Sequence, residues 1–89
     1  MNEQDIDKRF MELVAEILPP DPQRAPVSKE TKLLQDPAID SLTMSSLGFS
    51  VSAAFGIGTS ELVALIPQFQ NVGEALSLIK DELRKSGQL

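Results

Sequence analysis

Apolar residues return every three to four positions over long segments of this chain, and this spacing constrains its fold more than any other feature. Residues 3–18, 41–55 and 72–86 each carry one apolar stripe with the period of an α-helix, so each is expected to be an amphipathic helix. Residues 60–66 predict a shorter helix that tertiary packing must hold. No segment alternates with the period of a β-strand. The expected fold is all-α: a small four-helix bundle with three longer helices and a short third one.

Turn-forming residues mark the ends of the first two helices. The run Pro19-Pro20-Asp21-Pro22 is expected to end the first helix, because proline cannot continue one. Asp40 is a good N-cap for the second helix, although Ser41 could take that position instead. Gly56 and Gly58 are expected to end the second helix.

The two C-terminal helices carry similar signals. Thr59 or Ser60 is expected to cap the short helix, and Pro67 to close it. Asn71 is the expected N-cap of the last helix, and Gly87 is a plausible residue just beyond its end.

A long connection, residues 19–40, joins the first helix to the second. It is longer than most loops in compact domains, so we expect it to be held against the helices. Leu33 and Leu34 are the residues expected to hold it by burying their side chains. Prolines at positions 19, 20, 22 and 26 are expected to stiffen its first half.

The composition argues against several classes of function. The chain of 89 residues suits one small domain, here 1–89, and not two cores. A net charge of -5 argues against binding nucleic acid, which needs clustered lysine and arginine. The chain contains no cysteine and no histidine, so neither a metal site nor a catalytic thiolate or imidazole is expected. We therefore expect a protein that is not itself an enzyme.

The expected environment is the cytoplasm. The apolar runs are too short to span a bilayer, so no membrane insertion is expected. The first five residues are acidic and lack the apolar core of a signal peptide. A cytoplasmic monomer is the simplest expectation.

The tripeptide Asp40-Ser41-Leu42 places a serine at the expected start of the second helix. These three residues are common, and about three chains in a hundred of this length should contain them by chance. Asp-Ser at a helix start is also ordinary capping. The surrounding pattern is more specific: a first helix, a long loop ending in Ile39-Asp40-Ser41-Leu42, and Phe55 fourteen residues after Ser41. With the short third helix and the fourth helix in order, nearly the whole chain resembles the acyl carrier protein family.

That resemblance implies a function and a cofactor. Ser41 would carry a covalent 4′-phosphopantetheine arm, delivered from coenzyme A by a phosphopantetheinyl transferase, and Asp40 would be its usual acidic neighbour. A free-standing carrier of this kind would hold pathway intermediates as thioesters and present them to acyl- or aminoacyl-loading and processing enzymes. A negative phosphodiester at Ser41 would suit the positive end of a helix.

The second helix departs from the family pattern. The family often shows Leu-Gly where this chain has Pro37-Ala38, and bacterial fatty-acid carriers usually have acidic residues along this helix. Here residues 43–58 contain no charge, which points to a specialised lipid or polyketide pathway. The face away from the expected core stripe is expected to bind partners by shape and apolar contact; it comprises Leu42, Ser45, Ser46 and Phe49. The alternative is that Phe49 lies under the long loop and the serines are merely solvated.

Several alternatives remain open at this point. A peptidyl carrier loaded with an amino acid would have the same fold, and a helical adaptor without a prosthetic group would explain the fold and the acidity. A hydrolase is the least favoured, because Ser41 has no histidine to activate it. A final alternative concerns a set of apolar residues that either form the core or line a cavity for cargo between the helices: Met44, Leu47, Val51, Ile57, Leu62 and Ile79.

Overall fold

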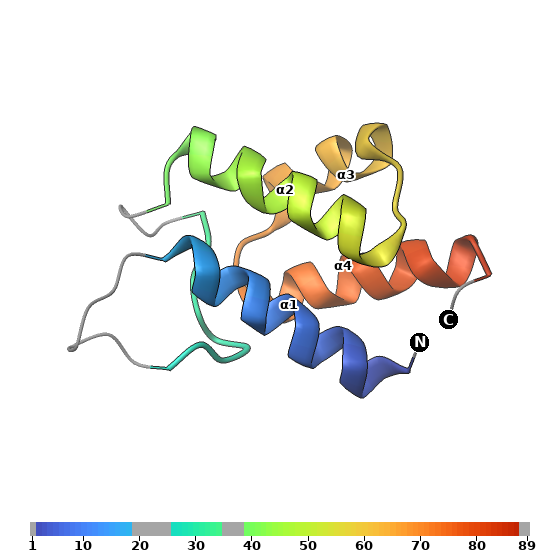
Figure 1. Ribbon diagram of the computed structural model, residues 1–89, viewed down its shortest axis with the longest axis horizontal. Helices are drawn as coiled ribbons and strands as arrows, with labels where there is room; N and C mark the ends of the chain where they lie inside the picture. Colours follow the sequence, from blue (N-terminus) through green and yellow to red (C-terminus); the bar gives the residue numbers. More distant parts are fainter. Residues whose placement is uncertain (1, 19–25, 35–38, 88–89) are drawn as a thin grey trace.

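Helices make up most of the computed structural model, which describes residues 2–18, 26–34 and 39–87 (Figure 1). Within these ranges the only β-type pairing is an isolated antiparallel bridge between Lys32 and Asn71, so the prediction of a small all-helical bundle is confirmed. No helix in the same ranges is long and apolar enough to cross a membrane. In chain order the elements are α1 (Glu3–Ile17), α2 (Ser41–Phe55), α3 (Thr59–Leu65), the short 3-10 helix η1 (Ile66–Gln68) and α4 (Val72–Lys85).

The core forms where α1 packs against both α2 and α4, while α3 packs against α2. Phe10 of α1 meets Phe69 edge to face, with ring centroids 6.3 Å apart and an interplanar angle of 84°. Both rings are fully buried, and Phe69 lies in the short link between η1 and α4, where no periodic pattern predicted a core residue. The buried stripe of α2 is close to the predicted one: Met44, Leu47, Val51 and Phe55 are buried and Ala54 is half-buried.

The short third helix is where the sequence predicts it, but its ends differ. Gly58 occupies the cap position without a side-chain hydrogen bond, so the expectation that Thr59 or Ser60 caps the helix is wrong. Pro67 does not stop the helical path either, because it lies in the first turn of η1. A proline is tolerated there, since the first N–H groups of a helical turn need no partner inside the helix.

The other helix ends follow the predictions more closely. α1 ends at Ile17, with Leu18 in extended conformation, one residue earlier than expected. The proline run at positions 19–22, expected to end it, lies outside the described residues. Asn71 caps α4 by accepting a hydrogen bond from the backbone N–H of Glu74, at 2.8 Å, and Gly87 has a positive φ of 78° just after the helix.

Ion pairs join α1 to α4. Lys80 lies 2.8 Å from a carboxylate oxygen of Asp7 that is itself buried, and 3.7 Å from Glu3. Arg84 lies 3.2 Å from Glu3. Part of the acidic surface of α1 is therefore neutralised within the fold.

Leu33 holds the long connection against the bundle, as predicted, and is fully buried. The same prediction is wrong for Leu34, whose exposed fraction is 39%. Both residues lie in a bend of the chain, where the Leu33 side chain enters the core and the Leu34 side chain stays at the surface.

Backbone hydrogen bonds add a second restraint that the sequence did not indicate. Residues 29–33 run alongside residues 70–73 at the start of α4, which brings the middle of the connection to the bundle. The bonds run from Leu33 N–H to the Gln70 carbonyl (3.0 Å), from Val72 N–H to the Thr31 carbonyl (3.0 Å) and from Gly73 N–H to the Lys29 carbonyl (2.9 Å).

Candidate functional site

Asp40 is the N-cap of α2, so of the two cap candidates in the sequence, Asp40 and Ser41, the first is correct. Asp40 has extended backbone angles, and its carboxylate accepts a hydrogen bond of 2.7 Å from the Thr43 backbone N–H. Ser41 is consequently the first helical residue and not the cap. Its side chain is exposed, so its hydroxyl is presented to solvent at the first position of the helix.

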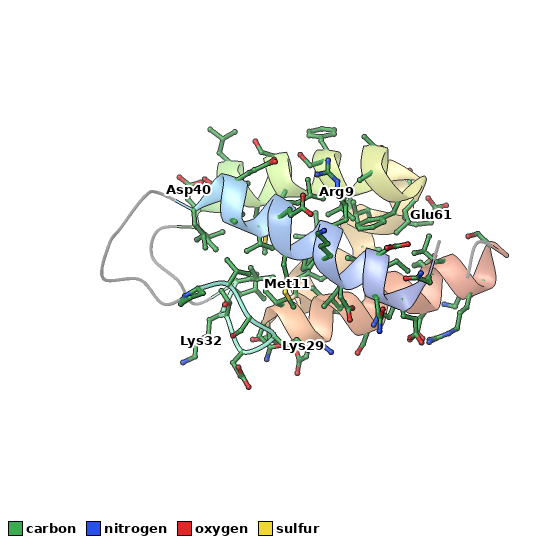
Figure 2. The ribbon with its side chains drawn as sticks, turned by 60° about the horizontal axis from the view of Figure 1, so that its bottom comes forward. Arg9, Met11, Lys29, Lys32, Asp40 and Glu61 are labelled. Carbon is green, nitrogen blue, oxygen red and sulfur yellow. The ribbon has the colours of Figure 1, made fainter. Side chains whose placement is uncertain are left out.

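Asp40 is the only charged residue in α2 and its N-cap. The hydrogen bond from the Thr43 N–H lowers the pKa of the Asp40 carboxyl below its ordinary value, which keeps the cap ionised. Figure 2 shows Asp40 and Glu61 toward opposite ends of the molecule's long axis. The exposed surface of α2 between its two ends is uncharged.

A pocket of about 330 Å³ opens beside Ser41. Asp40, Ser41 and Ser45 form its polar edge, and the other described residues that line it are apolar. The exposed Leu34 therefore forms part of a pocket wall, a role that the sequence did not indicate. The apolar walls come from the long connection, the start of α2 and η1: Leu33, Leu34, Ile39, Met44 and Ile66.

The four residues of the predicted partner-binding face on α2 are all exposed. Leu42 is 77% exposed and Phe49 is 65% exposed, and Ser45 and Ser46 between them are exposed as well. The alternative in which Phe49 lies under the loop is therefore wrong. Val63 of α3, 60% exposed, extends this apolar surface across to the neighbouring helix.

Gly48 marks a close approach between α2 and η1. A Cβ at this position would lie 2.8 Å from Cδ1 of Ile66 and 3.9 Å from a methyl of Leu62. A smaller notch of about 50 Å³ opens over this point, with walls that are almost entirely apolar. Its lining comes from α2, α3 and η1: Ser45, Gly48, Phe49, Thr59, Leu62, Val63 and Ile66.

The sequence analysis missed Ile66, and Gly48 was the signal that could have found it. An isolated glycine in a helix costs about 1 kcal/mol relative to alanine, so its presence indicates a close backbone or side-chain approach. The pattern of α2 alone does not show which residue approaches.

The residues considered for an internal cargo cavity are buried in the core. Met44 also contributes a wall to the pocket beside Ser41, and Leu62 a wall to the notch over Gly48. The two spaces that these residues border, beside Ser41 and over Gly48, open at the surface. The buried set is Met44, Leu47, Val51, Ile57, Leu62 and Ile79.

The fold and this site define a small helical bundle with an exposed serine at a capped helix start. No sequence-family model matches the chain, and neither the curated proteins nor the solved structures include a match. Among the described residues there is no group of acidic side chains arranged to hold a metal ion.

Proposed function

We propose that this chain is an acyl carrier protein that bears a 4′-phosphopantetheine arm on Ser41. The observation that carries the proposal is the placement of Ser41: its side chain is exposed at the first position of α2, while Asp40 provides the cap. A transferase can approach such a hydroxyl without unfolding any part of the bundle. The resemblance of the chain to the carrier family, based on residues 39–42 and Phe55, agrees with this placement.

The electrostatics of the helix start support an anionic attachment. The N–H groups of the first turn of α2 create positive potential at Ser41, and a phosphodiester there would lie in that potential. Asp40 is also negative, so its like charge partly opposes this gain. The hydrogen bond from the Thr43 N–H to the Asp40 carboxylate stabilises this charge at the helix start.

In this proposal the chain contributes no catalysis of its own. The serine oxygen forms a bond to the pantetheine-bearing phosphate of coenzyme A in a reaction that the transferase catalyses, and the nucleotide part of coenzyme A leaves. The thiol at the end of the arm would then hold the intermediate as a thioester. The role of the chain is to position the arm and to be recognised by partner enzymes.

An acyl cargo is favoured over an amino acid by the surface around Ser41. The pocket beside the serine is walled mainly by apolar side chains, and the notch further along α2 has almost no polar wall. Among the described residues that line them, Asp40 at the pocket edge is the only charged group placed to pair with an amino group. A peptidyl carrier remains the second candidate, with Asp40 as the partner of its amino group.

We infer that partner enzymes dock on the face formed by Leu42, Ser45, Ser46 and Phe49. Leu42 and Phe49 expose large apolar side chains on one uncharged helix of a chain whose net charge is -5, and Val63 of α3 adds to this apolar surface. A partner with an apolar contact surface fits this face better than one with a basic patch. The same exposure also fits a helical adaptor, which would need no attachment at Ser41.

The test of the proposal is transfer of the arm. The protein is incubated with coenzyme A, magnesium and a broad-specificity phosphopantetheinyl transferase, and its intact mass is measured. A carrier gains the mass of one arm, whereas an adaptor gains none.

A further inference from the structure

The outward face of α2 alternates large and small side chains along its length. The helix runs along one edge of the bundle, and one row of its residues recurs at helical spacing on the outer side (Figure 1). In chain order this outer row reads Leu42, Ser46, Phe49 and Ala53, and all four residues are exposed. A large apolar side chain is thus followed twice by a small one.

The outer row is complementary to itself when two copies of α2 lie antiparallel. A two-fold axis that passes between positions 47 and 48 places Leu42 opposite Ala53 of a second copy. The same axis places Ser46 opposite Phe49 of that copy, so each large side chain meets a small one. Parallel copies would instead bring Leu42 onto Leu42 and Phe49 onto Phe49, and would leave gaps at the small residues.

The small residues of the outer row also allow two helices to approach closely. Helices that meet through short side chains pack with their axes about 8 Å apart, the short end of the usual range. At that separation Leu42 and Phe49 would be covered by the second copy. Val63 of α3 lines a notch together with Phe49, so it flanks the contact and adds apolar surface to it.

The charge pattern permits two copies to meet at this face. Chains with a net charge of -5 repel one another unless the surfaces that meet are neutral. α2 carries no charge, so no like charges face each other along the outer row. In the antiparallel pair the two Asp40 caps lie at opposite ends, about 22 Å apart along the helix axis, which exceeds the Debye length of about 8 Å. A parallel pair would place the two caps side by side.

We propose that two copies of this chain associate through an antiparallel pair of α2 helices, with the outer row at the centre of the contact. One helix from each copy supplies most of the surface, so the dimer is weak and reversible, with a dissociation constant on the order of 100 µM. The paired state covers Leu42 and Phe49, and a copy within the dimer therefore has no free docking face for another protein.

Sedimentation equilibrium of the full chain tests the association, over concentrations from about 5 µM to about 1 mM. The average mass should rise from the 9.7 kDa of one chain toward twice that value. Added salt should strengthen the pairing, because it screens the repulsion between two acidic chains and leaves the apolar contact in place. A mass that stays at 9.7 kDa throughout would overturn the proposal and leave this face to a different partner.

Ser46→Glu places a charge at the centre of the outer row without removing a core contact. Each copy would then bring an unpaired carboxylate against Phe49 of the other, so the dissociation constant should rise by at least about tenfold. Ser77→Glu is the matched control, because Ser77 is an exposed serine of α4 outside the outer row and the substitution adds the same charge. Equal weakening by the two variants would show an effect of net charge alone and contradict the proposed contact.

Disulfide formation tests the direction of the two helices. The chain has no cysteine, so Leu42→Cys and Ala53→Cys each introduce a single thiol. Equal amounts of the two variants are mixed with oxidised glutathione, which accepts the two electrons and two protons released when two thiols join. The antiparallel pair brings position 42 close to position 53 of the other copy, so the mixed disulfide should exceed the two like disulfides together by about tenfold, whereas random pairing gives equal amounts. Like disulfides in excess would show a parallel pair and overturn the proposal.

These experiments need neither the arm nor a transferase, so their outcome is independent of the test of the carrier function. If the chain dimerises with the predicted disulfide pattern but Ser41 accepts no arm, the dimer stands and the carrier function is wrong. If Ser41 accepts the arm but the chain remains a monomer at every concentration, the carrier function stands and the proposed dimer is wrong.

Discussion

Asp40 links the start of α2 to pH through its hydrogen bond with the Thr43 N–H. This bond lowers the pKa of the carboxyl from its ordinary value of 3.8, so the folded state binds this proton less readily than the unfolded chain. The stabilisation is therefore complete above the ordinary value and is lost as the pH falls through the lower, folded pKa. Asp40→Asn keeps a capping oxygen but removes the charge.

We predict that the wild-type protein has a higher thermal midpoint than Asp40→Asn at neutral pH and that this difference disappears in acid. Circular dichroism melts of both proteins across this range measure it. Taking the difference between the two proteins removes the titration of the other carboxyl groups, which both share. A difference that stays constant down to pH values below the folded pKa would contradict the role of the charged cap.

At the residue scale, local signals predicted the caps of α2 and α4 but not that of α3, and they predicted long-range contacts poorly. Asp40 and Asn71 were recognisable because an N-cap needs only its own side chain and the next three residues. Leu34 and Ile66 were not, because their places depend on a pocket formed by segments far apart in the sequence. Gly48 was visible as an exception within its helix, but its partner was not.

The contact between α1 and α4 depends on Lys80, whose side chain is only 14% exposed. Lys80→Met keeps most of the apolar stem but removes the charge that pairs with Asp7 and Glu3, and should lower the free energy of unfolding by about 1.5 kcal/mol. Lys85→Met is the matched control, because Lys85 is 75% exposed and pairs with Glu82 within the same helix. Its effect should stay within about 0.5 kcal/mol.

Urea unfolding of both variants provides the comparison. Equal losses for Lys80→Met and Lys85→Met would show that the ion pairs between α1 and α4 add nothing beyond ordinary surface pairs.

At the element scale, the helices were predictable, whereas for the connection between α1 and α2 only the burial of Leu33 was predicted correctly. The apolar spacing and the caps of the longer helices lie within each segment, so they can be recognised without knowing the fold. Residues 29–33 are instead held by backbone hydrogen bonds to residues 70–73, and backbone pairing leaves little trace in side-chain types. The ends of α3 were mispredicted for a similar reason, since the helical path continues through Pro67 into η1.

At the scale of the whole molecule, one phenylalanine lies in the core and another lies on the outer surface. Phe69 is fully buried against Phe10, and Phe49 is 65% exposed. Phe69→Ala should cost about 3–5 kcal/mol of folding free energy and leave a small domain largely unfolded. Phe49→Ala should change stability by less than about 0.5 kcal/mol. Thermal and urea unfolding of both variants tests this; a large loss for Phe49→Ala would remove the case for a free docking face.

The docking face makes a separate prediction about recognition. Phe49→Ala should slow modification of Ser41 by the transferase at low protein concentration by at least about fivefold, if Phe49 is a central contact. Raising the salt concentration should have little effect, because α2 carries no charge. A steep fall in rate with salt that is the same in Phe49→Ala would show that a charged surface, such as that of α1, guides the transferase instead.

The central claim is that the exposed hydroxyl of Ser41 is the attachment point of a phosphopantetheine arm. Intact mass spectrometry after incubation with coenzyme A, magnesium and the transferase tests it most directly, with Ser41→Ala and Ser45→Ala beside the wild-type protein. Ser45 is the matched control, because it is an exposed serine on the same helix and lines the same pocket. We predict one arm on the wild-type protein and on Ser45→Ala, and none on Ser41→Ala. An unmodified wild-type protein, under conditions that fully modify a known carrier, would contradict the account.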